Sequence, residues 1–280
     1  MKADLGLTAV TEGLVTATLL LAGCGATTLE AASTSTPTAV VSTAATVETT
    51  STVSSTVEGV DVDWSTLPTT EVTLTDAGTT ITAAGTYVLS GSTTGQVVVN
   101  SDGAVRLVLN GVTIASSAGA AIQVDGAELT VIELAEGSTN TVSDAATRSD
   151  ESIDGAIYSS DDLYITGSGS LSVTSNFADA IVGKDDLWIE SGTLSIASAD
   201  DGIRGKDSLT ISGGTITEAS GGYMAAGIGS GYQGLGTVTI EGDAVIKNAQ
   251  GGEAGAGIGS GTRGDSEIII RGDAVIENAE

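Results

Sequence analysis

The sequence predicts a stacked β-solenoid, because three consecutive segments repeat one strand-like pattern. They read DGAIYSSDDLYITG, DAIVGKDDLWIESG and DGIRGKDSLTISG. Equivalent isoleucines and equivalent leucines are both 24 and then 22 residues apart: Ile157, Ile181 and Ile203, and Leu163, Leu187 and Leu209. A period in the low twenties, with alternating apolar positions inside each unit, indicates one coil per repeat. Glycine (39 of 280 residues) and scarce aromatics (3%) suit a solenoid better than a globular core.

Short alternating strands precede these repeats from Glu71 onward. The clearest is Val105–Ile114, which places Val105, Leu107 and Leu109 on one face and predicts a turn at Asn110-Gly111. No segment of the domain has sustained 3.6-residue periodicity. We therefore expect almost no helix outside a signal peptide.

The repeats continue to the end of the chain, and their inward pairs stack on one another. These pairs are Leu163/Ile165, Leu187/Ile189, Leu209/Ile211, Val238/Ile240 and Ile268/Ile270. Successive coils rise by about 4.8 Å, so like residues lie on like. The last coils lengthen to 30 residues, from Ile228 to Ile258. Because Glu280 follows a strand with no capping segment, we expect a solenoid truncated at its C-terminal end.

The N-terminal region is typical of an exported lipoprotein. The apolar run Leu14–Ala22 is too short to span a membrane, and Leu21-Ala22-Gly23-Cys24 resembles a bacterial lipobox. We expect a signal peptide at 1–23, lipidation of Cys24, a Ser/Thr-rich disordered tether at 24–60 and a β-helix domain at 61–280, glycine-rich over 221–280. The predicted location is extracellular, lipid-anchored to the cell membrane.

Charge and missing residue types exclude several functions. The formal charge is −27, from 36 acidic and 9 basic residues, so nucleic acid is not an expected partner. The chain lacks His, the commonest general base and zinc ligand, and its single Cys cannot form an intramolecular disulfide.

Acidic residues stand at equivalent places between the strands. Stacked carboxylates about 4.8 Å apart repel by about 1 kcal/mol in water and more in a half-buried site, so a ladder of them favours a bound cation. Calcium suits such oxygen ligands. The alternative is that Asp serves only as a turn residue beside Gly. The candidate ligands are Asp154, Asp161, Asp162, Asp179, Asp185, Asp186, Asp200, Asp201 and Asp207.

Two outward groups are candidate ligand contacts. Alternation places Tyr158 outward in one coil, and Lys184, Arg204 and Lys206 outward in the next two. The basic residues either receive an anionic ligand or neutralise the neighbouring acids. Tyr164 and Trp188 occupy the same outward position of adjacent strands. They form either a flat platform for a sugar ring or an ordinary cross-strand aromatic pair.

These motifs together resemble a bacterial family of extracellular carbohydrate-binding β-helix proteins. The resembling stretches include AAGTYVLSG, VRLVLNGVTI, TVIELAEGSTNTVSD and GAIYSSDDLYITGSGSL, within about residues 83–216. The resemblance implies a pectate-lyase-like, right-handed parallel β-helix, bound calcium and binding of cellulose or polygalacturonate. The family's acidic coil motif falls on Asp161, Asp162, Asp185, Asp186, Asp200, Asp201 and Asp207. Beyond Gly221 the match fades into generic glycine-rich repeats.

Three functions fit these features. The first is a non-catalytic, monomeric module that binds polysaccharide through calcium. The second is a polysaccharide lyase, in which Lys184, Arg204 or Lys206 abstracts a proton beside a uronate carboxylate. A hydrolase with paired Asp residues is weaker, since that class also uses a His. The third is a structural stalk or adhesin segment. We favour the binding module.

Overall fold

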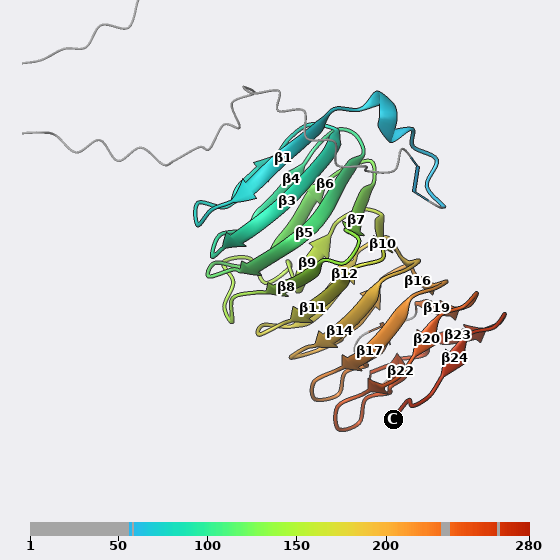
Figure 1. Ribbon diagram of the computed structural model, residues 1–280. Coiled ribbons are helices and arrows are strands. Elements are labelled where there is room, and N and C mark those ends of the chain that lie inside the picture. Colours follow the sequence, from blue (N-terminus) through green and yellow to red (C-terminus); the bar gives the residue numbers. More distant parts are fainter. Residues whose placement is uncertain (1–55, 58, 231–235, 262–263) are drawn as a thin grey trace, which may run out of the picture. The chain divides into compact units, whose positions relative to one another are not determined.

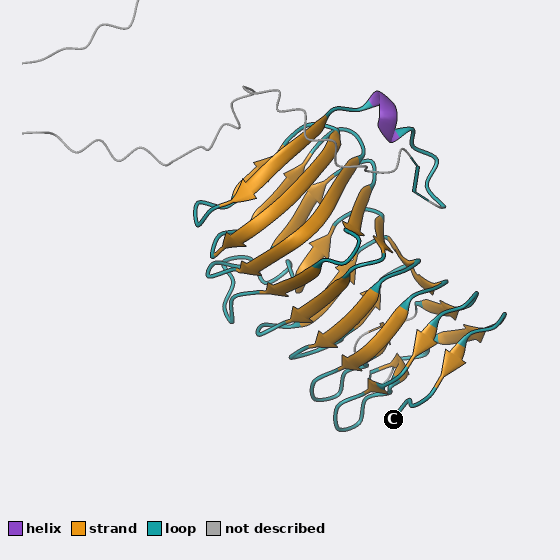
Figure 2. Cartoon of the chain, viewed as in Figure 1, coloured by secondary structure: helices purple, strands orange, loops and turns teal. Residues whose placement is uncertain are grey.

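The computed structural model describes residues 56–57, 59–230, 236–261 and 264–280, which form a parallel β-helix (Figure 1). The predicted signal peptide, Cys24 and all but the last few tether residues lie outside the described residues. Figure 2 shows strands joined by loops, with one 3-10 turn, η1 (Trp64–Thr66). In the described ranges, no helix is long and apolar enough to cross a membrane. The expected all-β solenoid is confirmed.

Each full coil places one strand on each of three faces. Face 1 consists of β7 (Thr130–Leu134), β10 (Leu163–Gly167), β13 (Asp186–Ile189), β16 (Ser208–Ile211), β19 (Thr237–Ile240) and β23 (Glu267–Ile270). Face 2 consists of β8 (Thr139–Ser143), β11 (Ser170–Thr174), β14 (Thr193–Ala197), β17 (Thr215–Ser220), β20 (Val245–Ile246), β21 (Ala249–Gln250) and β24 (Val275–Ile276). Face 3 consists of β2 (Thr79–Ile81), β4 (Val97–Asn100), β6 (Ile122–Gly126), β9 (Gly155–Ser159), β12 (Asp179–Gly183), β15 (Ile203–Gly205), β18 (Ile228–Ser230) and β22 (Ile258–Ser260).

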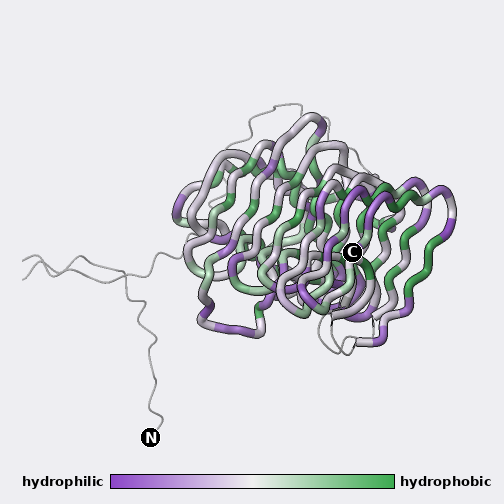
Figure 3. The backbone as a smooth tube through the Cα atoms, turned by 90° about the horizontal axis from the view of Figure 1, so that it is seen from below, coloured by the Kyte–Doolittle hydropathy of each residue, from purple (hydrophilic) through white to green (hydrophobic). Residues whose placement is uncertain are grey.

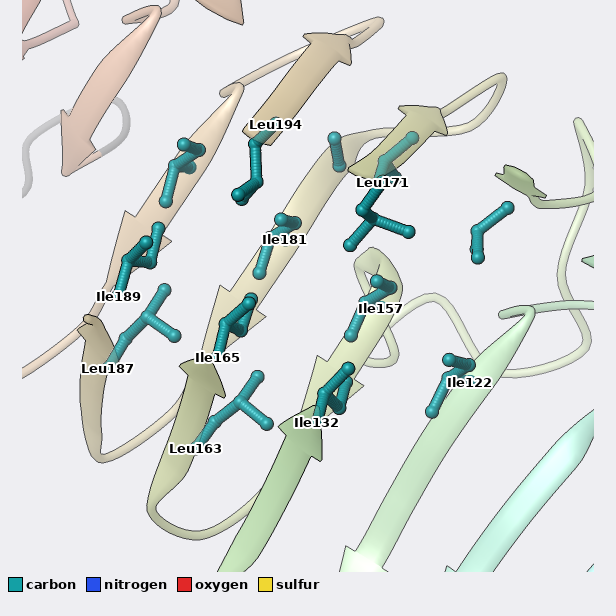
Figure 4. Packing of buried hydrophobic residues seen from close by; sticks show 14 of the residues in the cluster. Ile122, Ile132, Ile157, Leu163, Ile165, Leu171, Ile181, Leu187, Ile189 and Leu194 are labelled. Atoms are coloured by element: carbon teal, nitrogen blue, oxygen red, sulfur yellow. The ribbon is translucent and has the colours of Figure 1, made fainter. Parts of the chain in front are cut away.

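Ladders of identical aliphatic residues form the core. Leu163 pairs with Leu187, which pairs with Leu209, and Ile157, Ile181 and Ile203 are in register on face 3. Figure 4 shows Leu163 and Leu187 from face 1 and Ile157 and Ile181 from face 3 in one packed interior. Figure 3 shows many of the hydrophilic residues at the turns between strands. Because each rung is fully buried, truncating one leucine to alanine costs about 2–5 kcal/mol.

The predicted turn at Asn110-Gly111 is wrong. The early strands β1 (Thr69–Leu74), β3 (Gly85–Thr93) and β5 (Val105–Ala115) are long, and β5 pairs with β7 through its first half and with β8 through its second. Gly111 has a φ of +73°, so it bends one continuous strand between faces 1 and 2 and does not reverse the chain. The prediction failed because Asn-Gly occurs both at hairpin turns and at the corners of a solenoid.

The final coil departs from the expected burial pattern. Ile268 and Ile270 pair with Val238 and Ile240 as predicted, yet they are 43% and 54% exposed. Their strand, β23, has a hydrogen-bonded neighbour on one side only within the described residues.

The segment before β1 packs on the outside of face 1. Val57 and Trp64 are buried against Ala104 and Val131, and Val57 lies inside the range predicted as a tether. The Arg106 guanidinium lies 5.8 Å from the Trp64 ring centroid.

Candidate functional site

Three carboxylates meet where the chain passes from face 2 to face 3. Asp179 is the first residue of β12, and Asp200 and Asp201 precede β15, so register brings Asp201 beside Asp179. One carboxylate oxygen from each residue lies within 4.8 Å of the others. We call Asp179, Asp200 and Asp201 the acidic cluster. Within the described residues, this cluster is the one place where three or more potential metal ligands come together.

Backbone amide groups hold part of this cluster in place. Asp179 Oδ1 accepts from the Asp201 N–H at 2.9 Å, and Asp201 Oδ1 accepts from the Ala226 N–H at 2.7 Å. Each buried carboxylate therefore satisfies an amide of the following coil. These bonds engage Oδ1 of both residues, while the Oδ2 atoms of Asp179 and Asp201 lie on the side of Arg204.

Two basic side chains approach from the same face. Arg204 Nε donates to Asp179 Oδ2 at 2.7 Å and Arg204 Nη2 donates to Asp154 Oδ2 at 2.6 Å. Lys184 Nζ donates to Asp154 Oδ2 at 2.7 Å. The acidic cluster and Asp154 supply four carboxylates against these two cations, which leaves two negative charges when all four acids are ionised.

The pKa values reflect this excess of buried negative charge. Burial, with the nearby Asp179 charge, raises the pKa of Asp201 to about 7, and burial raises that of Asp179 to about 6 although Arg204 opposes the rise. Burial alone would lower the pKa of Arg204, but Asp179 and Asp154 hold it above its ordinary range, so Arg204 stays charged. A divalent cation would replace the protons that these acids otherwise retain.

The other predicted calcium ligands lie at the opposite ends of the face 3 strands. Their carboxylates bond neighbouring turns: Asp161 Oδ2 accepts from Ala127 N at 3.1 Å, and Asp162 Oδ1 accepts from Asp186 N at 3.3 Å. Asp186 Oδ1 accepts from the Ser208 hydroxyl at 2.6 Å. The structure does not gather these residues with the acidic cluster; the set is Asp161, Asp162, Asp185, Asp186 and Asp207.

The outward column of face 3 is more covered than alternation predicts. Tyr158 is 8% exposed and Val182 is fully buried, so this outward column presents little open surface. Arg204 reaches from β15 past β12 to Asp154, and Lys184 lies 5.6 Å from the Tyr158 ring centroid, so their side chains cover this column. Lys206 remains exposed, with its Nζ 3.8 Å from Asp207 Oδ1.

The predicted aromatic neighbours are in contact on face 1. Tyr164 and Trp188 are in register, and their rings stack with centroids 4.4 Å apart and planes 16° apart. Tyr164 also packs against the cluster that contains Val57 and Trp64. The platform therefore lies on a different face from the acidic cluster, with one ring partly covered.

Sequence reasoning missed a hollow on face 3 lined by Gln96, Gln123 and Arg148. Gln123 is in register with Tyr158, so extending the outward column by one coil would have found it. Arg148 lies in an irregular loop, where no periodicity places it.

The fold and site define a parallel β-helix with a partly buried acidic cluster. Residues 75–274 match the family described as carbohydrate-binding domain-containing protein, and the chain belongs to that family. A carbohydrate-binding domain-containing protein of Acetivibrio thermocellus is 33% identical over 148 residues, covering 50% of this chain and 49% of the relative, so the match spans about half of that protein. A solved structure described as the polysaccharide lyase-like protein from C. thermocellum, gadolinium derivative, aligns with a TM-score of 0.52 and 28% identity. The alignment covers 71% of this chain and 87% of that chain.

Proposed function

We propose that this protein binds polysaccharide of the plant cell-wall type, cellulose or polygalacturonate, in a calcium-dependent and non-catalytic manner. The observation that carries the proposal is the acidic cluster, in which three carboxylates lie in mutual reach. With Asp154 ionised as well, these acids would outnumber Arg204 and Lys184 by two charges, an excess that a divalent cation would neutralise. Calcium is divalent and accepts several carboxylate oxygens in flexible geometry.

In this proposal, the acidic cluster holds calcium, and Trp188 contacts sugar directly. Asp200 and the second oxygens of Asp179 and Asp201 would hold calcium, which supplies a charge that can bind sugar carboxylates or hydroxyls. Arg204 now bonds one of those oxygens, so it would turn toward Asp154 or toward a ligand anion when calcium binds. Trp188 offers a second contact, a ring face for sugar stacking on face 1.

Anchoring at the cell surface is part of the proposal and depends on the lipobox-like Leu21-Ala22-Gly23-Cys24. Export with lipidation of Cys24 would hold the β-helix outside the cell on its Ser/Thr-rich tether. Metabolic labelling with a fatty acid tests this point. Label in the wild type that is lost in Cys24→Ser supports the anchor, and equal label in both contradicts it.

A lyase is the second candidate, favoured by the polysaccharide lyase-like relative. It needs a basic group able to accept a proton, but Arg204 is held in its charged form by Asp179 and Asp154. Lys184 bonds Asp154 and would have to leave it. Ultraviolet absorbance of unsaturated uronate products, measured with several uronans and calcium, decides between binding and cleavage.

Retention on insoluble cellulose and on immobilised polygalacturonate tests the binding function. We expect retention with calcium, release by EDTA, and weakened retention of Asp201→Asn by about tenfold or more. Asp102→Asn is the matched control, because it removes the same charge from an exposed loop residue and should behave as wild type. Retention that neither EDTA nor Asp201→Asn changes would contradict the calcium role. No retention on either polymer would favour a structural stalk.

A further inference from the structure

A second polar site lies on the outside of face 3, before the acidic cluster along the helix. It is a hollow of about 250 Å³ beside β4 and β6, bordered by the loops that precede β6 and β9. Its lining is more polar than apolar, and the residues that carry the argument are Gln96, Gly119, Gln123, Asp125, Arg148 and Asp150. The repeat pattern of the sequence predicts no ligand contact at any of these residues.

Hydrogen bonds fix the amides in this hollow. Gln96 Nε2 donates to Ala120 O at 2.8 Å and to Gln123 Oε1 at 3.3 Å. Gln123 Nε2 in turn donates to Asp125 Oδ1 at 2.6 Å. This relay orients both amides and the carboxylate before any ligand arrives, which lowers the ordering cost of binding.

Arg148 supplies unsatisfied donors at the same place. Its side chain is 2% exposed, and Nη2 donates to Asp144 Oδ2 at 2.5 Å and to Gly155 O at 3.0 Å. Within the described residues, Nε and Nη1 are buried and have no hydrogen-bond partner. Buried donors left without an acceptor destabilise the fold, so an oxygen that reached Arg148 Nε or Nη1 would bind favourably.

Gly119 keeps the space beside Arg148 open. A Cβ atom at Gly119 would lie 3.0 Å from Gln96 Nε2 and 3.9 Å from Arg148 Nη1. The backbone has a φ of +118°, a conformation that favours glycine. A side chain here would therefore occupy the space between the amide and the guanidinium.

The charges of the hollow indicate the class of ligand. Arg148 is already paired with Asp144, and Asp125 and Asp150 add two carboxylates to the lining. An anion would meet net negative charge on a protein of charge −27. Hydroxyl groups, in contrast, can donate to the two carboxylates and accept from the guanidinium and amides.

We propose that this hollow is a subsite for an uncharged, hydroxyl-bearing sugar unit and that it acts without calcium. The ligand class rests on the proposed saccharide-binding function. One registered column on face 3 consists of Gln123, Tyr158, Val182 and Arg204. The hollow therefore lies three strand spacings, about 14 Å, from Arg204, which bonds Asp179 of the acidic cluster. One glycan chain lying along the helix axis can contact both places.

Titration calorimetry with cellohexaose in EDTA tests the subsite. We expect the wild type to bind, and Gln123→Ala to bind about tenfold more weakly because it removes the relay and one ligand contact. Gln250→Ala, an exposed glutamine on face 2, is the matched control and should bind as wild type. Asp150→Ala removes an exposed acceptor at the rim and provides a second variant if Gln123→Ala fails to fold.

The outcomes separate this subsite from the proposed function. Equal cellohexaose affinity in the wild type, Gln123→Ala and Asp150→Ala, or no binding at all in EDTA, overturns the subsite even if calcium-dependent retention on polygalacturonate persists. Weakened cellohexaose binding in Gln123→Ala supports the subsite, whatever happens to polygalacturonate retention. Polygalacturonate retention that neither Asp201→Asn nor EDTA changes would contradict the calcium role and leave the subsite standing. An oligogalacturonate that binds in EDTA and loses affinity in Gln123→Ala overturns the assignment to uncharged sugars.

Discussion

Replacing Asp201 by Asn should stabilise the calcium-free protein at alkaline pH. Burial raises the pKa of Asp201 from its ordinary value of 3.8 to about 7, so the folded protein binds this proton more tightly than the unfolded chain does. The resulting stabilisation is fully present below about pH 4 and is lost as the pH rises through about 7. A difference of about three pH units corresponds to an upper limit of about 4 kcal/mol.

The substitution isolates this effect because asparagine retains an oxygen for the Ala226 N–H but cannot ionise. In EDTA, we expect the free energy of unfolding of the wild type to fall between about pH 5 and about pH 8 more steeply than that of Asp201→Asn. At the higher pH the variant should be more stable, by up to about 4 kcal/mol. Excess calcium should reverse this order, since a ligand that binds only the folded state stabilises the protein that retains the site.

Urea denaturation, followed by circular dichroism at both pH values with and without calcium, measures these differences. Asp102→Asn controls for the loss of one negative charge from a protein of charge −27. Parallel pH dependence of the wild type and Asp201→Asn would refute the reasoning, because it would mean that Asp201 is ionised in the folded state at no cost.

Three further predictions concern the scaffold and the platform. Asn140→Ala should cost several kcal/mol in urea denaturation, since Asn140 Oδ1 accepts from the Gly111 and Val112 N–H groups and alanine leaves both donors without this acceptor; a loss below about 1 kcal/mol would contradict this. Gly252→Ala should destabilise more than Gly111→Ala, because the Cβ at Gly252 would lie 1.6 Å from a backbone oxygen, whereas the Cβ at Gly111 meets open space and adds only the strain of a φ of +73°; comparable melting temperatures would argue against such close coil packing. Trp188→Ala should weaken retention on cellulose several-fold while leaving calcium-dependent stabilisation unchanged, and unaltered retention would remove the platform from the binding surface.

The repeats predicted the fold because solenoid packing is local and periodic. Ile157, Ile181 and Ile203 stack because each coil repeats the last, so spacing in the sequence becomes register in space. The same logic placed Tyr164 beside Trp188. It also placed Asp179 and Asp201 at one position of neighbouring coils, although their burial was not evident from spacing.

Features that depend on side-chain reach or on irregular loops were not predictable in this way. Alternation places Tyr158 outward, but it cannot reveal that Lys184 and Arg204 cover the column. Asn140 is buried and bonds the Gly111 corner, a contact between residues 29 positions apart. Arg148 belongs to a loop without periodicity, and only the folded chain brings it beside Gln96 and Gln123.

A crystal structure of the protein grown with calcium and an oligogalacturonate would show whether the acidic cluster holds calcium together with a sugar. We expect anomalous scattering from an ion about 2.4 Å from oxygens of Asp179, Asp200 and Asp201, with sugar oxygens completing its coordination. Arg204 should then have left Asp179 Oδ2. Calcium bound only at the turns of Asp161 and Asp186, with Arg204 still bonded to Asp179 and sugar elsewhere, would contradict the claim.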